Sequence, residues 1–226
     1  AVAFTVYPLL NGLAWYWLPF FIILIAGVIN AYNFMDGING ITVLYSLVSI
    51  STLFWISTEL EILQSTSFFL SILASLLVFA FFNVRKIAKC FAGDIGSVSL
   101  AFIISYLILK LVLATQWPYW ILLLGIYGID SVFTIVCRIF RKESLMQAHR
   151  SHFYQYLVNE KRIEHVQVSI IYAISQILLN LVVIYAFSTQ QMWLVMASLF
   201  VFLIIYTIFR LRLEGHKRLF VTYNPD

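Results

Sequence analysis

The sequence predicts an all-α, polytopic helical membrane protein. Apolar residues make up 62% of the 226 residues and charged residues only 11%, whereas a soluble domain carries about a quarter charged residues. Apolar runs recur along the whole chain, and runs of about 18 residues are long enough to cross the ~30 Å of bilayer hydrocarbon as helices. The length suits one bundle, so we expect a single integral-membrane domain over residues 1–226.

Seven apolar runs are the predicted transmembrane helices, and each is bounded by polar or turn residues. The Asn- and Gly-rich stretch NAYNFMDGING follows the first run, and basic loops follow the third, fifth and seventh. The second, fourth and sixth runs end in the short connections STELEILQSTS, ATQWP and STQQ. In chain order, the runs cover residues 13–31, 40–57, 66–82, 97–114, 118–136, 166–187 and 191–210.

Lysine and arginine residues are concentrated on one side of this predicted bundle. Thirteen of the fourteen lie in the loops after the third and fifth runs or toward the C-terminal tail, and Lys110 alone lies near the other side. The positive-inside rule therefore places these loops, NAYNFMDGING and the C-terminus in the cytoplasm. The basic bias indicates contact with anionic lipid head groups or an anionic substrate rather than with nucleic acid.

The first polar cluster is residues 30–40. Its polar side chains are those of Asn30, Asn33, Asp36 and Asn39. The first three recur every third residue and line one side of a helix end, while Gly37 and Gly40 let the backbone bend close to a ligand. The side-chain amide of Asn39 offers a donor beside an acceptor, as the edge of uracil requires. Four such groups beside a lipid-facing run favour a binding site over a polar helix cap.

The second cluster is CFAGDIGSVSL, residues 90–100. Gly93 and Gly96 flank Asp94, and we expect Ser97 to cap the helix that follows. The first free amides of a helix bind phosphate, and a carboxylate beside them can hold Mg²⁺. A capped turn with an exposed aspartate is the alternative interpretation.

The third cluster is MQAHRSHFYQYL, residues 146–157, in the longest basic loop. His149 and His152 lie one helical turn apart with Arg150 between them, and together they supply donors for a diphosphate. An ordinary basic loop beside the membrane is the alternative. No carboxylate lies at zinc-ligand spacing from these histidines, so a zinc site is not expected.

Asp130 lies inside the fifth run, nearer its cytoplasmic end. A carboxylate at membrane depth needs a partner. The sequence leaves two roles open, which are orientation of the basic loop that follows and a contact between helices.

Taken together, the three clusters resemble the polyprenyl-phosphate N-acetylhexosamine-1-phosphate transferases of glycosyltransferase family 4. NAYNFMDGINGI resembles the family motif Asn-Ala-x-Asn-x-x-Asp-Gly-x-Asp/Asn-Gly-Leu, and FAGDIGSVSLAF resembles Phe-Met-Gly-Asp-x-Gly-Ser. AHRSHFYQYL resembles the histidine-containing last loop, and the order of the three matches as well.

This resemblance implies a multi-pass enzyme of the bacterial inner membrane with its active-site loops in the cytoplasm. It would transfer an N-acetyl-sugar 1-phosphate from a UDP-sugar to undecaprenyl phosphate and release UMP, starting a lipid-linked surface glycan such as O-antigen. Its implied cofactor is Mg²⁺, or Mn²⁺ in its place. Its implied partners are the two substrates, membrane lipid and a second copy in a homodimer.

The resemblance also assigns roles to individual residues. The implied catalytic residues are Asp36, Asp94, His149 and His152. The implied substrate-binding residues are Asn30, Asn33, Asn39, Phe91 and Arg150, of which Asn39 and Phe91 read and stack on uracil. The implied metal ligands are Asp94 and Asn33.

Three departures from the family pattern keep other readings open. Many bacterial members have Asp at the position of Asn39, and Asn83 lies one residue further from Asp94 than the family's corresponding Asn. The chain contains no Asp-Asp pair, although the family carries one in an earlier cytoplasmic loop. We therefore expect that an N-terminal part is missing. The alternatives are a catalytically incomplete membrane partner in glycan assembly, and an anion or nucleotide-sugar transporter, whose site would lie nearer the bilayer midplane.

Overall fold

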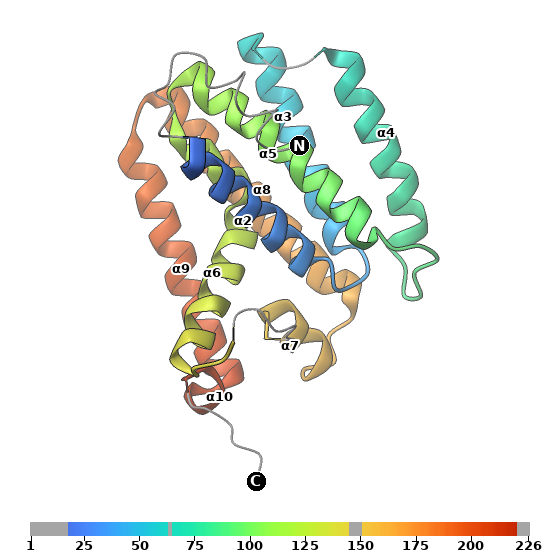
Figure 1. The fold of residues 1–226 in the computed structure, drawn as a ribbon, viewed down its shortest axis with the longest axis vertical. Coiled ribbons are helices and arrows are strands. Elements are labelled where there is room, and N and C mark those ends of the chain that lie inside the picture. The colour runs from blue at the N-terminus through green and yellow to red at the C-terminus, as the bar shows by residue number, and fades with distance from the viewer. Residues whose placement is uncertain (1–17, 63–64, 145–150, 221–226) are drawn as a thin grey trace.

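The computed structural model describes residues 18–62, 65–144 and 151–220, and these ranges contain helices and no β-strand. Figure 1 shows them as a bundle of long helices with two short helices, α7 and α10, at one end. In chain order the elements are α2 (Leu18–Met35), α3 (Ile41–Leu60), α4 (Thr66–Asn83), α5 (Gly93–Thr115), the 3₁₀-helix η2 (Pro118–Leu124), α6 (Gly125–Phe140), α7 (Phe153–Asn159), α8 (His165–Thr189), α9 (Met192–Glu214) and α10 (His216–Phe220).

The helices confirm the predicted class of multi-pass, all-α membrane protein. Within the described residues, six stretches are long and apolar enough to cross a membrane, and α2 contributes a shorter apolar helix. The six are Ile41–Leu60, Thr66–Asn83, Gly93–Thr115, Pro118–Phe140, His165–Thr189 and Met192–Glu214. Each predicted apolar run therefore corresponds to one helical stretch, and the side that faces the cytoplasm remains a prediction.

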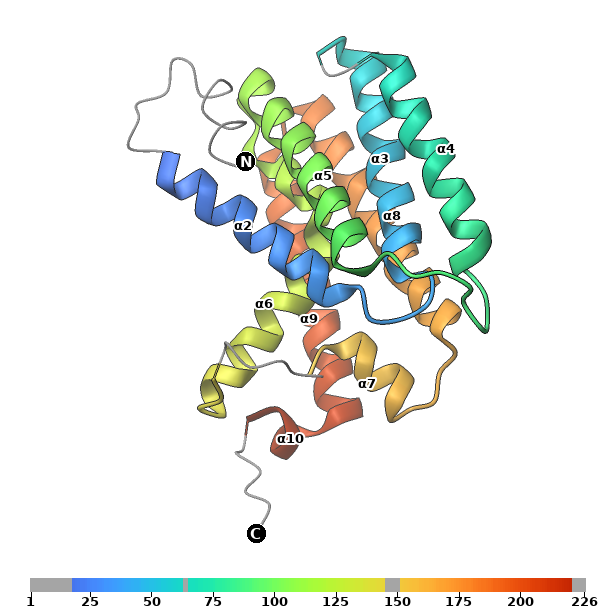
Figure 2. The same cartoon turned by 45° about the vertical axis from the view of Figure 1, so that its right-hand side comes forward.

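Helix α3 lies at the centre of the bundle and packs most extensively on α8 and α4, while α2 packs along α5. In Figure 2, α2 ends near the start of α3, at the end of the bundle where α7 also lies. Tyr45 of α3 stacks on Tyr127 of α6 with ring centroids 3.6 Å apart, and both side chains are buried. This buried contact packs α3, which begins directly after the first polar cluster, against α6.

The fifth apolar run corresponds to the candidate span Pro118–Phe140, but the helix changes type within it. The 3₁₀-helix η2 ends at Leu124, and α6 begins at Gly125. Gln176 of α8 fills the break, because its Oε1 accepts from the amide of Ile126 (3.0 Å) and its Nε2 donates to the carbonyl of Leu122 (2.9 Å). Unpaired backbone groups in hydrocarbon cost several kcal/mol each, so such a break needs a polar side chain from a neighbouring helix.

Candidate active site

Asp36 is fixed at the point where the first cluster meets the second. Its Oδ1 accepts from the hydroxyl of Thr42 at 2.5 Å, and the backbone amide of Gly93 is close enough to lower the pKa of its carboxyl. Gly93 is the first residue of α5, so this amide is one of the free donors at the helix start. The loop then turns through Gly40, whose φ of 89° favours glycine. Asp36 therefore lies at the amino-terminal end of α5.

Ser97 has a different role from the predicted one. Helix α5 begins at Gly93 rather than at residue 97, so Ser97 lies one turn inside the helix and is buried. Its hydroxyl donates to the side-chain oxygen of Asn33 at 2.6 Å instead of capping the helix. The predicted cap is wrong because the glycines and Asp94 are themselves helical. The bond brings Asn33 of α2 to the first turn of α5.

The two carboxylates of the site repel each other. Asp94 is exposed in the first turn of α5, and Asp36 is half-buried. Burial raises the pKa of the Asp36 carboxyl, and the negative charge of Asp94 raises it further, against the lowering effect of the bonds from Thr42 and Gly93. This excess of negative charge would be relieved by a cation.

The donor set suits a magnesium ion. Asp36 and Asp94 offer carboxylate oxygens and Asn33 an amide oxygen, all of which are hard ligands of the kind that Mg²⁺ takes. No group of three or more His, Cys, Asp or Glu side chains converges anywhere in the described ranges. Mg²⁺ needs no such cage, because it is commonly held by one or two carboxylates together with substrate phosphates and water.

Asn83 joins the first cluster to the loop that leads into the second. Its Oδ1 accepts from the amide of Gly40 (2.7 Å), and its Nδ2 donates to the carbonyl of Cys90 (2.8 Å). The side chain is buried at the end of α4. Sequence reasoning noted Asn83 only as a departure in spacing. An amide at the end of an apolar run was the available signal.

Asn39 makes a second connection to the same loop. Its side chain is 7% exposed, and its Nδ2 donates to the carbonyls of Arg85 (2.9 Å) and Lys86 (3.2 Å). The backbone of Asn39 is also held, since its carbonyl accepts from the hydroxyl of Ser169 at 2.8 Å. Asn39 therefore orders the loop in this structure, and its uracil-reading role remains a prediction.

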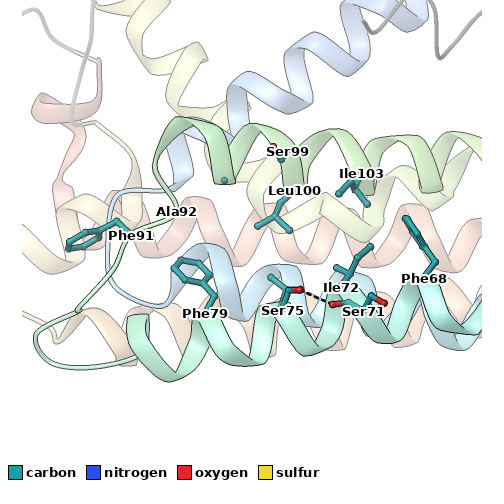
Figure 3. A pocket seen from close by; sticks show the side chains of 12 residues that line it. Phe68, Ser71, Ile72, Ser75, Phe79, Phe91, Ala92, Ser99, Leu100 and Ile103 are labelled. Carbon is teal, nitrogen blue, oxygen red and sulfur yellow. Dashed lines mark hydrogen bonds between the residues drawn. The ribbon is translucent and has the colours of Figure 1, made fainter.

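Two predicted substrate-binding residues are exposed. Asn30 lies on α2 one turn before Asn33. Phe91 is 72% exposed and lines one end of an apolar groove of about 570 Å³ between α4 and α5. Figure 3 shows Phe91 on the loop, with Phe79 of α4 and Leu100 of α5 further along the groove. The ring is accessible for stacking on a base, which the structure does not test.

The third cluster is only partly described, because His149 and Arg150 lie outside the described residues. His152 is 2% exposed, and its Nδ1 lies 3.2 Å from Oδ1 of Asp130. It forms the N-cap of α7, where its amide donates to the side chain of Gln155 at 3.2 Å. His152 is therefore enclosed by protein, and its catalytic role remains a prediction.

Asp130 has both of the roles that the sequence left open. Its Oδ1 accepts from the amide of Phe153 (3.1 Å) as well as pairing with His152, so it orients the start of α7. Its Oδ2 accepts from the hydroxyl of Tyr172 of α8 at 2.5 Å. The same carboxylate thus connects α6 to α7 and to α8.

Helix α7 covers the backbone of the first cluster. The hydroxyl of Tyr154 donates to the carbonyl of Phe34 at 2.8 Å. Gly37 lies against the same side chain so closely that a Cβ at this position would overlap the Tyr154 hydroxyl. Phe34 and Gly37 flank Asp36, so α7 forms one wall of the candidate site.

Sequence reasoning missed Arg210, which it counted only among the basic residues that set the orientation. The side chain is 1% exposed, and it pairs with Glu214 at 2.5 Å and donates to the carbonyl of Ser151 at 2.8 Å. The signal in the sequence was an Arg four residues before a Glu at the end of an apolar run.

The family model for glycosyl transferase family 4 matches residues 2–112, which include both of the first two clusters. The chain is also 30% identical, over 196 residues and 85% of its length, to a Bacillus subtilis (strain 168) protein named "Probable undecaprenyl-phosphate N-acetylglucosaminyl 1-phosphate transferase". The chain belongs to glycosyl transferase family 4. This confirms the resemblance inferred from the three motifs.

Other relatives match shorter parts of the chain. The phospho-N-acetylmuramoyl-pentapeptide-transferase of Streptococcus thermophilus (strain CNRZ 1066) is 29% identical over 127 residues, which are 55% of this chain and 35% of that protein. The match to the Bacillus protein covers 54% of that protein. The chain therefore spans about half of the length of its Bacillus relative and about a third of its Streptococcus relative.

Proposed function

We propose that the protein transfers an N-acetyl-sugar 1-phosphate from a UDP-sugar to undecaprenyl phosphate and releases UMP. The observation that carries the proposal is the meeting of Asn33 and Asp36 of the first cluster with Asp94 of the second, at the amino-terminal end of α5. Free helix amides and a carboxylate pair that favours a cation suit a diphosphate. The names of the Bacillus and Streptococcus relatives describe transfers of this class.

In the proposed reaction, an oxygen of the lipid phosphate forms a bond to the β-phosphorus of the UDP-sugar. The bond from the β-phosphorus to the bridging oxygen breaks, and UMP leaves with its electron pair. Asp94 and Asn33 would hold Mg²⁺, or Mn²⁺ in its place, which when bound supplies positive charge to the diphosphate. The protein contributes mainly positioning and electrostatic stabilisation, as phosphoryl transfer requires.

The proposal extends to the remaining site residues and to the location of the protein. Phe91 would stack on uracil and Asn39 would read its edge, while His149 and Arg150 would contact the diphosphate and sugar. The site would face the cytoplasm at a bacterial inner membrane, and the product would start O-antigen or a related surface glycan. A homodimer is part of this proposal.

A transferase assay tests the proposal. The full-length protein in membrane vesicles receives labelled UDP-N-acetyl sugars, undecaprenyl phosphate and Mg²⁺, and UMP release is followed. We expect Asp94→Asn to lower the rate about 10²–10³-fold and a chelator to abolish it. Glu59→Gln is the matched control, because Glu59 is an exposed carboxylate near the far end of α3.

Each of the other outcomes rejects the proposal. A folded full-length protein that releases no UMP would be the incomplete partner rather than the enzyme. Uptake of intact UDP-sugar into the vesicles without UMP would identify a transporter. An Asp94→Asn variant as active as the Glu59→Gln control would place the chemistry elsewhere.

A further inference from the structure

We propose that Arg210 of the last long helix, α9, is a positioning residue for the candidate active site. It would act through α7, which lies between Arg210 and the backbone around Asp36. The inference rests on the proposed function for its kinetic consequences. Its structural part, the dependence of α7 on Arg210, stands on contacts between described residues.

The first step is the hold of Arg210 on the chain that enters α7. One arm of the guanidinium donates to the carbonyl of Ser151 at 2.8 Å. The other arm donates to the hydroxyl of Thr134 at 3.0 Å, while Nε pairs with Glu214 at 2.5 Å. A rigid planar fork can satisfy these three directions at once, whereas a lysine ammonium on a flexible stem cannot match their geometry.

The second step is the hold of Asp130 on the same turn. Thr134, which accepts from Arg210, donates its own proton to Oδ1 of Asp130 at 3.2 Å. The same carboxylate oxygen accepts from the amide of Phe153 at 3.1 Å. The turn into α7 is therefore held at Ser151 by the buried cation and at Phe153 by the buried anion.

The third step leads from α7 to the site. Tyr154 follows directly after the held turn, and its hydroxyl donates to the carbonyl of Phe34 near the end of α2. Its hydroxyl also lies against Gly37. A displacement of the start of α7 would therefore be transmitted to the two residues that flank Asp36.

The distribution of burial in α9 supports a specific role for this arginine. All residues of Met192–Glu214 are described, and the buried ones are Val195 and Arg210. Most of α9 thus presents apolar side chains outward, as lipid contact requires, and a buried charge is costly unless it is well paired. An arginine at this position is explained by its partners in α6 and at the start of α7.

The experiment compares variants of the full-length protein in lipid nanodiscs. Arg210→Met removes the charge and the fork, Arg210→Lys keeps the charge alone, and Tyr154→Phe removes the bond to Phe34. Arg212→Met is the matched control, because Arg212 is an exposed arginine on the same helix. Hydrogen–deuterium exchange of Phe153–Asn159 and steady-state kinetics are measured for each.

We expect Arg210→Met to speed amide exchange in α7 about 10-fold or more and to lower kcat at least as strongly. Arg210→Lys should change amide exchange and kcat less than Arg210→Met does, and Arg212→Met should match the wild type. If Arg210 acts through Tyr154, adding Tyr154→Phe to Arg210→Met should lower kcat less than the product of the two single effects.

The outcomes separate this inference from the proposed function. A wild-type protein without transferase activity overturns the proposed function, and the exchange data still decide whether α7 depends on Arg210. An active wild type with unchanged exchange in Arg210→Met and Arg210→Lys overturns the inference alone. The inference would also be overturned if the effects of Arg210→Met and Tyr154→Phe on kcat multiply independently in the double variant. If Arg210→Met does not fold, Arg210→Lys and Tyr154→Phe carry the same comparison.

Discussion

The hydroxyl of Ser97 donates a 2.6 Å hydrogen bond to the side-chain oxygen of Asn33, across 64 residues of sequence. Ser97 is fully buried in α5, and Asn33 lies in the last turn of α2. The bond sets the rotation of the two helices at the point where Asp36 meets Asp94. It therefore fixes the relative placement of the first two motifs.

The first prediction concerns this bond. Ser97→Ala should lower the transfer rate about 10-fold and raise the Mg²⁺ concentration needed for half-maximal rate, because the Asn33 oxygen loses the donor that orients it. Ser99→Ala is the control, since Ser99 lies on the same helix facing the groove. The rate is measured over a series of Mg²⁺ concentrations, and equal curves for the two variants would contradict the prediction.

The second prediction concerns Asp36 in the metal-free protein. Its pKa is raised, so between the unfolded value of 3.8 and the higher folded value the folded state holds more protons than the unfolded state. The free energy of unfolding should therefore fall as the pH rises through that window. Asp36→Asn should be more thermally stable than wild type at about pH 7 yet inactive, and the difference in stability should shrink toward about pH 4.

The measurement for Asp36 is thermal unfolding in detergent with a chelator present, at both pH values. The chelator matters because a bound cation would offset the repulsion from Asp94. If Asp36→Asn is less stable than wild type at neutral pH, the ionised carboxylate of Asp36 does not destabilise the folded state.

The third prediction concerns Asn83. Asn83→Ala leaves the amide of Gly40 and the carbonyl of Cys90 without their partner, and should lower the free energy of unfolding by about 1–3 kcal/mol. Asn159→Ala, at the exposed end of α7, should change it little. Denaturant unfolding of both variants checks this, and equal stabilities would mean that the two loops are held together by other contacts.

The fourth prediction concerns the close contact of Gly37 and Tyr154. Gly37→Ala should lower the transfer rate, because the added methyl group overlaps the tyrosine hydroxyl. Combining it with Tyr154→Phe removes the nearest overlapping atom and should restore part of the rate. The comparison is between kcat of the double variant and of Gly37→Ala. A double variant slower than either single variant would contradict the close contact.

The transmembrane helices could be predicted because each one is set by its own sequence. An apolar run of spanning length in lipid can satisfy its backbone only as a helix. The start of α5 was misplaced because Gly93, Asp94 and Gly96 are weak helix formers. In the structure this helix start interacts with Asp36 and Asn33, which come from another part of the chain.

The candidate site could be predicted as three motifs but not as a geometry. The sequence identified Asn33, Asp36 and Asp94 by residue type and spacing. It could not show that Asn39 donates to the carbonyls of the 84–92 loop, nor that His152 is buried against Asp130. These contacts join residues far apart in the chain, and no local pattern encodes them.

The sequence alone determined that this protein is a helical membrane protein of family 4, because hydropathy and motif spacing are properties of contiguous residues. The tertiary structure alone decided where the fifth run breaks and what Arg210 contacts. In both cases a polar group is removed from water and needs a partner. Gln176 bonds to backbone groups that would otherwise be unpaired at the break. The buried guanidinium of Arg210 is paired with groups of Ser151, Thr134 and Glu214. Such partners are supplied by packing, which brings distant segments together.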